Sequence, residues 1–155
     1  MLTNATKIAI RASLYLAMFS NETKKLGVKH IAETLEIPRP FLAKLLQKLN
    51  KSDIVSSTKG PHGGFYLNEI NTKKRVWEII VCIDNPDRFS HCFLGLAECS
   101  DENPCPVHFT VAPFKKNILN DFKGKTIAQF ANEIKNSDKI IISLKDFDVL
   151  DKKQC

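Results

Sequence analysis

The sequence predicts a mainly α-helical protein that contains one small β-hairpin. Apolar residues recur at helical spacing in several segments, and one segment rich in β-branched residues leads into a turn with three glycines. The chain has 155 residues, 43% of them hydrophobic, which is enough to bury the core of one domain with an appended element.

Three helices are expected in the first third of the chain, over residues 4–20, 28–37 and 40–50. Pro38 and Pro40 separate the second from the third, because proline is tolerated in the first turn of a helix but not in its interior. The third helix is expected to bury one apolar face, which consists of Phe41, Leu42, Leu45, Leu46 and Leu49.

A β-hairpin is expected directly after the third helix. Residues 54–58 and 65–67 would form its two strands, joined by the turn Lys59-Gly60-Pro61-His62-Gly63-Gly64. Two short helices, the second with exposed cations, followed by a hairpin, form the winged helix-turn-helix pattern. The alternative to a DNA-binding wing is an ordinary hairpin with a flexible tip. The candidate DNA contacts are Arg39, Pro40, Phe41, Lys44 and Lys48 from the helix, and Lys59, Gly60, His62 and Gly63 from the wing.

The charge distribution also favours an anionic partner for the first half of the chain. Residues 1–80 carry 13 Lys and Arg against 6 Asp and Glu, whereas residues 81–155 carry 10 against 11. Nucleic acid is the commonest partner of such a basic half, and a solvated basic face is the alternative. No secretory leader and no apolar run of ~20 residues is present, so we expect a cytosolic (cytoplasmic) protein with no membrane partner.

A fourth helix is expected over residues 71–84, with Thr72 as its cap and Cys82 as a buried structural cysteine. A later helix is expected to begin near Pro106, to kink or restart at Pro113 and to end at Gly124. It carries a seam suited to a partner helix, or to packing on its own domain: Val107, Val111, Phe114, Ile118 and Phe122. Thr126 and Gln129 then predict a capping box for a short helix through Ile134.

Between these helices, the chain concentrates the residue types that bind soft metals. Cys92, Cys99, Cys105 and His108 have the spacing Cys-x6-Cys-x5-Cys-x2-His. Thiolate and imidazole are ligands of iron–sulfur clusters and of zinc, and clustered cysteines in a cytosolic protein are more often metal ligands or redox sensors than disulfides. Four interpretations remain open: a cluster, a thiol–disulfide switch, a zinc site, or a metal-free loop. The short Cys-x2–4-Cys unit usual in zinc sites is absent.

Residues 27–67 resemble the winged-helix domain of the IscR- and NsrR-type regulators of the Rrf2 (Rrf-two) family, and the resemblance extends over roughly residues 1–134. The matching residues are Ile31-Ala32, Ile37-Pro38, Phe41-Leu42, Leu45-Leu46, Leu49 and the wing 59–65. The wing departs from the family's Arg-Gly-Pro-Gly-Gly-Gly-Tyr pattern at Lys59, His62 and Phe65. Lysine contacts phosphate but lacks the planar fork with which arginine reads bases.

The resemblance implies a homodimeric, DNA-binding transcriptional regulator that senses iron–sulfur status or redox and nitrosative stress, and not an enzyme. Its long helix would make the dimer, and the dimer would bind a pseudo-palindromic operator in double-stranded DNA. The implied ligands of an iron–sulfur cluster are Cys92, Cys99, Cys105 and His108. We expect a [2Fe–2S] cluster in preference to a [4Fe–4S] cluster, because Lys7 occupies about the position at which some [4Fe–4S] relatives have an acidic residue. A winged-helix protein-interaction module is the alternative from another class.

The expected organisation therefore has four parts. Residues 1–84 form the winged helix-turn-helix DNA-binding domain, and residues 85–106 form a cysteine-rich sensor loop. Residues 107–134 form the dimerisation helix and the following short helix, and residues 135–155 form a C-terminal tail.

Overall fold

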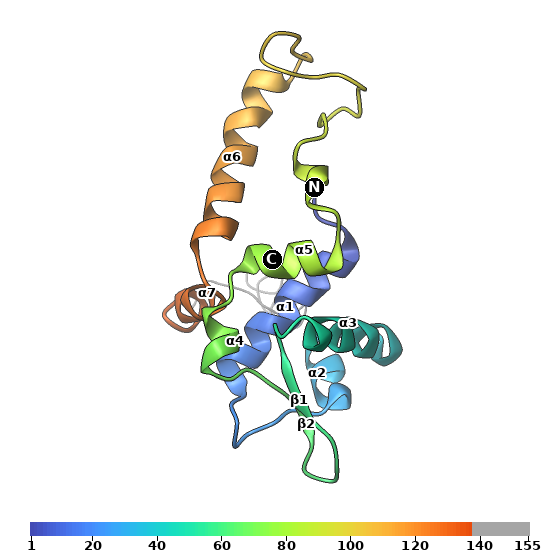
Figure 1. Cartoon of the computed structure of the whole chain (residues 1–155), viewed down its shortest axis with the longest axis vertical. Helices are drawn as coiled ribbons and strands as arrows, with labels where there is room; N and C mark the ends of the chain where they lie inside the picture. The colour runs from blue at the N-terminus through green and yellow to red at the C-terminus, as the bar shows by residue number, and fades with distance from the viewer. Residues whose placement is uncertain (138–155) are drawn as a thin grey trace, which may run out of the picture.

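The computed structural model describes residues 1–137, which fold into seven α-helices, one short 3-10 helix and one two-stranded sheet. The elements are α1 (Asn4–Phe19), α2 (Val28–Leu35), α3 (Arg39–Lys51), β1 (Ser56–Thr58), β2 (Gly64–Tyr66), α4 (Glu69–Lys73), α5 (Val76–Ile83), η1 (Pro86–Phe89), α6 (His108–Gly124) and α7 (Ile127–Lys135). This confirms the predicted fold class. Figure 1 shows the hairpin at one end of the long axis and the loop that precedes α6 at the other.

The core is built around α1, which packs against α3, α5 and α7. Its buried face includes Ala9, Ala12 and Leu16, all fully inaccessible to solvent. The two alanines allow neighbouring helices to approach closely, while leucines and isoleucines from those helices fill the remaining space. The helix begins where predicted, because the Thr3 side chain accepts a hydrogen bond from the Thr6 amide at 3.3 Å.

Helices α2 and α3 form the predicted helix-turn-helix pair. Helix α2 ends at Leu35, two residues earlier than expected, because Glu36 adopts a left-handed conformation with φ 55°. Helix α3 buries Leu42, Leu45, Leu46 and Leu49, as predicted. Phe41 was expected on this buried face, and that was wrong: its side chain is exposed, because it lies at the margin of the apolar stripe.

The predicted hairpin is confirmed, with β1 and β2 antiparallel and Ser57 opposite Phe65. Ile54 and Val55 were expected in the first strand but lie before it, where both are buried in the core. The Leu26 and Phe65 amides each donate to the other residue's carbonyl, at 2.9 and 2.8 Å. These bonds attach the base of the wing to the segment that precedes α2.

The prediction of a single helix over residues 71–84 was wrong, because two helices, α4 and α5, occupy this region. Asn68 caps α4 in place of Thr72, and Lys74 and Arg75 between the helices are extended. The break has a tertiary cause, because Arg75 pairs with Thr126 and the Ile127 amide donates to the Lys74 carbonyl at 2.8 Å.

Helix α6 packs against the domain only through its C-terminal half. It contains no buried side chain over its full described length, although Ile118, Leu119 and Phe122 are partly buried against the core. The helix continues through Pro113 without a restart and ends at Gly124, as predicted.

Helix α7 follows α6 and returns to the core. The predicted capping box of Thr126 and Gln129 is present, and Ile127 and Ala131 are buried against the domain. The apolar residues 140–142 and Cys155 lie outside the described residues. Within residues 1–137, the helices are too short or too polar to cross a bilayer.

Candidate metal centre and nucleic-acid interface

The cysteine loop, residues 90–107, is anchored to the domain just before it begins. Phe89 is buried and packs on Trp77 with ring centroids 5.7 Å apart. Asp84 accepts hydrogen bonds from the Thr6 hydroxyl at 3.3 Å and from Arg88 Nε at 2.9 Å. Burial raises the pKa of Asp84, but hydrogen bonds from Thr3 and Asn85 and the charge of Arg88 outweigh it. The net pKa of this carboxyl is lowered.

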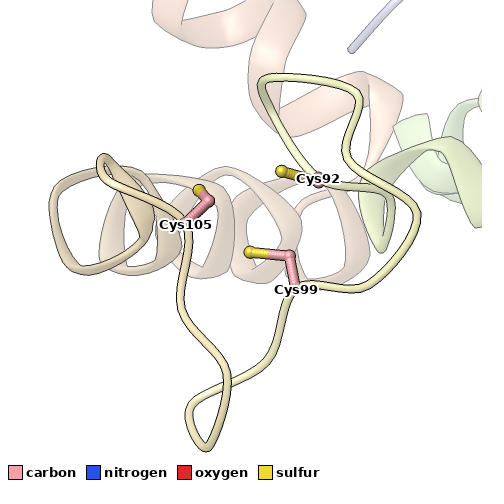
Figure 2. Close-up of side chains that lie close together, drawn as sticks. All are labelled: Cys92, Cys99 and Cys105. Atoms are coloured by element: carbon pink, nitrogen blue, oxygen red, sulfur yellow. The ribbon is translucent and has the colours of Figure 1, made fainter.

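Within the loop, three thiols from distant positions converge. The sulfurs of Cys92, Cys99 and Cys105 all lie within 4.8 Å of one another, and Figure 2 shows them facing a shared space. Cys105 is buried at 7% exposure, whereas Cys92 and Cys99 are half-buried. All three are free thiols. A turn after Cys92 closes with a bond from the Gly95 amide to the Cys92 carbonyl at 3.1 Å, with Gly95 at φ 76°.

His108 is the first residue of α6 and lies beside these thiols. Its Nδ1 is 3.0 Å from the sulfur of Cys99, and its Nε2 is 2.8 Å from a carboxylate oxygen of Asp101. The imidazole lies outside the group of three sulfurs that are mutually within 4.8 Å. The structure therefore brings all four sequence-predicted ligands into one region, with the histidine at its edge.

The thiols differ in their acidity. Burial raises the pKa of Cys92, but hydrogen bonds from the backbone of Leu96 and Leu94 and from the other two thiols lower it to about 7. For Cys99, a backbone hydrogen bond from Cys105 lowers the pKa, but burial and the neighbouring thiols outweigh it, and the net pKa is raised. Cys92 is thus more readily converted than Cys99 to a thiolate, the form that binds metals and attacks disulfides.

A cavity of ≈ 340 Å³ lies between the loop and α6. Its lining includes the three cysteines and His108, and also three cations of α6: Lys115, Lys116 and Lys123. Lys115 donates a hydrogen bond to the His91 carbonyl and so joins α6 to the start of the loop. Lys123 lies 4.6 Å from the ring centroid of Trp77.

The donor set fits a soft metal or an iron–sulfur cluster. Three thiols and one imidazole match the preferences of iron–sulfur clusters and of zinc. Sulfurs bound to one tetrahedral metal at ~2.3 Å lie roughly 4 Å apart, so the observed separations within 4.8 Å need little rearrangement for thiols that share one metal ion. Thiols divided between the two irons of a cluster would have to move farther apart. Cys82 was expected to be buried but is half-buried between α5 and α3. Its sulfur lies 3.3 Å from Ser52 Oγ, apart from the three loop thiols.

In the helix-turn-helix, α3 presents a polar face opposite its buried leucines. At 100° per residue, Pro40, Lys44, Gln47 and Lys51 lie near the centre of that face. Arg39 and Phe41 are exposed at its two margins. Lys48 lies on the flank, where its ammonium donates to the Ile83 carbonyl at 3.3 Å.

The wing residues fall into two groups. Lys59, Gly60 and His62 are exposed at the tip. Gly63 is half-buried, and a Cβ there would meet the Thr58 carbonyl oxygen at 2.3 Å. Gly63 therefore shapes the turn, whereas Gly60 has φ 104° and nothing within 4 Å of its Cβ position.

The sequence did not indicate Asp101 or Lys115, although both contact the cysteine loop's key residues. An acidic residue seven positions before a histidine follows no known ligand spacing. Both contacts depend on how the loop folds back on α6, and sequence periodicity carries no information about that.

The chain is similar to known transcriptional regulators along most of its length. Residues 2–133 match the sequence model of the Rrf2 family, described as an iron-dependent transcriptional regulator. A protein of Aquifex aeolicus named as an HTH-type transcriptional regulator is 37% identical over 132 residues, covering 84% of this chain and 90% of the relative. IscR of Klebsiella pneumoniae is 26% identical over 131 residues, covering 84% and 79% respectively.

Two solved structures share the fold. T. potens IscR superimposes with a TM-score of 0.66 at 20% identity, covering 91% of this chain and 93% of that one. CymR of B. subtilis, described as the global cysteine regulator, has a TM-score of 0.66 at 18% identity, covering 86% and 97%.

Proposed function

Since the chain belongs to the Rrf2 family of DNA-binding transcriptional regulators, we propose that it is a homodimeric repressor or activator whose cysteine loop binds an iron–sulfur cluster. Its relatives are regulators and not enzymes, in agreement with the prediction from the sequence. The observation that carries the proposal is the convergence of three thiols within 4.8 Å beside the first residue of α6.

The DNA contacts would come from α3 and the wing. Helix α3 would enter the major groove with Arg39, Pro40, Phe41 and Lys44, and Lys48 would contact the DNA backbone from the flank. At the wing tip, Lys59 and His62 would contact phosphates. Gly60 would allow the backbone to approach, and Gly63 would hold the turn in shape.

The dimer would form through α6. Phe109 is 68% exposed and Phe114 is 56% exposed, on a helix that has no buried side chain over its described length. Phe114 belongs to the predicted seam, and exposed apolar surface along a helix is a site that a second copy can cover. Two copies paired along α6 would place two winged helices on one pseudo-palindromic site.

Cys92, Cys99, Cys105 and His108 would hold the cluster, with [2Fe–2S] favoured over [4Fe–4S]. When bound, the cluster would supply a redox-active group with one exchangeable, imidazole-bound position. The chain itself would couple the cluster to the position of α6, because its ligands come from two elements. His108 belongs to α6, whereas Cys92 belongs to the loop that follows η1. Binding both together would fix α6 relative to the domain and thereby the spacing of the two wings.

Anaerobic purification with counts of iron, sulfide and zinc tests this proposal. We expect about two irons and two sulfides per chain, and their loss in Cys92→Ala. Zinc alone would make the loop a structural metal site. Absence of metal, with thiols that oxidise reversibly, would leave a thiol-switch or metal-free regulator. Equal DNA affinity with and without the cluster would refute the coupling.

DNA binding is tested with a duplex selected by the protein from random-sequence DNA. Lys44→Ala should weaken binding and reduce the salt slope by about 0.9, because one fewer phosphate contact releases fewer counterions. Lys48→Ala should have a smaller effect, and Lys135→Ala, on the exposed side of α7, serves as the matched control. Binding without salt dependence would instead favour a protein-interaction module.

A further inference from the structure

Both ring nitrogens of His108 are already engaged. Nε2 lies 2.8 Å from the Asp101 carboxylate and Nδ1 lies 3.0 Å from the Cys99 sulfur. The two partners differ in exposure, since the Asp101 side chain is 90% exposed whereas that of His108 is 14% exposed. The carboxylate thus reaches from the loop surface to a largely buried imidazole.

The two contacts assign a different role to each nitrogen. An ionised carboxylate only accepts hydrogen bonds, so the proton of this contact belongs to Nε2. Nδ1 is then the nitrogen that faces the thiols, whether it accepts from the Cys99 thiol or donates to its thiolate. Either way, the nitrogen atom adjacent to the three sulfurs is Nδ1.

We propose that Asp101 is a positioning residue that holds the Nε2–H of His108, so that Nδ1 is the atom offered to the metal centre. This inference rests on the proposed function of the cysteine loop. Histidines that bind metals generally donate their other ring N–H to a carboxylate or carbonyl, which fixes the orientation and tautomer of the ring. Here Asp101 makes that contact with Nε2 at 2.8 Å.

The loop provides a matched control. Glu102 is the adjacent acidic residue, is exposed, and makes no hydrogen bond or ion pair with any residue in the range 1–137. Asp101→Ala and Glu102→Ala remove the same charge from neighbouring positions, but only the first removes the contact with His108. Asp101→Asn keeps an oxygen that can accept from Nε2 and serves as the conservative variant.

The first measurement uses the reduced, metal-free full chain labelled with 15N-histidine, and long-range 15N–1H NMR correlations to identify the tautomer of His108. We expect a proton on Nε2 in wild type, Glu102→Ala and Asp101→Asn, and a mixture of tautomers in Asp101→Ala. The same tautomer population in wild type and Asp101→Ala would overturn the proposal.

The second measurement is the loss of iron to a chelator after anaerobic reconstitution with Fe²⁺ and sulfide. Asp101→Ala should lose iron about 10- to 100-fold faster than wild type, and Asp101→Asn should recover most of the difference. Equal rates in wild type and Asp101→Ala would overturn the positioning role. Wild type that takes up no iron would refute the proposed function, whereas the NMR result still decides the tautomer independently.

Discussion

The wing and the cysteine loop are both connections with glycine and proline, at opposite ends of the molecule, but different groups hold them in shape (Figure 1). The wing is held by backbone: Leu26 and Phe65 exchange two hydrogen bonds, and Gly63 and Gly64 lie against carbonyl groups. The cysteine loop has short-range backbone bonds, such as that between Gly95 and Cys92, but side chains attach it to α6. These contacts join His108 to Cys99 and Asp101, and Lys115 to His91.

The difference indicates which of the two can respond to a signal. A turn whose backbone groups hydrogen-bond to one another needs no ligand to hold its conformation. Its conformation can therefore stay the same in every state of the protein. A loop that exposes Phe93, Leu94 and Leu96 and gathers three thiols leaves much of its stabilisation to whatever the thiols bind. We therefore expect the wing to be constant and the cysteine loop to vary with metal.

The largest effect should come from adding a methyl group inside the wing. In Gly64→Ala, the Cβ would lie 2.7 Å from the Leu26 carbonyl oxygen, at a φ of 156°. We expect a loss of roughly 1–3 kcal/mol in the free energy of unfolding and a tenfold or greater loss of DNA affinity, with unchanged metal content. Chemical denaturation and titration with DNA measure both.

Gly124→Ala is the control for this variant, because nothing lies within 4 Å of the Cβ position in α6. It should leave DNA affinity unchanged. If Gly64→Ala bound DNA as tightly as wild type, the wing would be less rigid than its backbone contacts imply.

On the proposed function, an intermediate effect should follow removal of the bound metal from the purified protein. Amide hydrogen exchange in residues 90–107 should become at least tenfold faster, because the thiols lose their common partner. Exchange in residues 56–66 should not change. Equal acceleration in the two segments would mean that the wing also depends on metal, and the comparison between them would fail.

The smallest effect should come from Asp84, which ties the start of the cysteine loop to α1. Because its pKa is lowered in the folded state, its contribution is present at neutral pH and is lost as the pH falls through that lowered pKa. Asp84→Asn should cost roughly 1–2 kcal/mol at pH 7. The difference from wild type should shrink toward pH 3, as measured by unfolding at both pH values.

Local patterns predicted most of the fold, because caps, prolines and apolar spacing act within a few residues. The box of Thr126 and Gln129 and the leucine face of α3 are examples. The break between α4 and α5 was not predictable in this way, since Lys74 and Arg75 are extended by pairing with a segment some fifty residues later in the chain.

In the candidate site, too, some features could be predicted from the local sequence and others depend on contacts between distant segments. The ligand types and their order along the chain are visible in the sequence, and the structure brings the three thiols together. The contact between Asp101 and His108 depends on the path of the loop in space. Phe41 was misplaced for a related reason, because a residue at the margin of a helical stripe is buried only if a neighbouring element covers it.

The pairing of Lys74 with Ile127 also has a geometric consequence for α6. It attaches the C-terminal end of this 17-residue helix to the domain. The helix is about 25 Å long and can tilt as a rigid unit about that point. A displacement of about 1 Å at His108, at the opposite end of the helix, would tilt it by roughly 2° about that point. Shifts of this size at helical interfaces separate the states of many switching proteins. In the proposed dimer, a change of about 1 Å in the position of His108 would thus become a change in angle, and this angle would change the distance between the two DNA-binding domains.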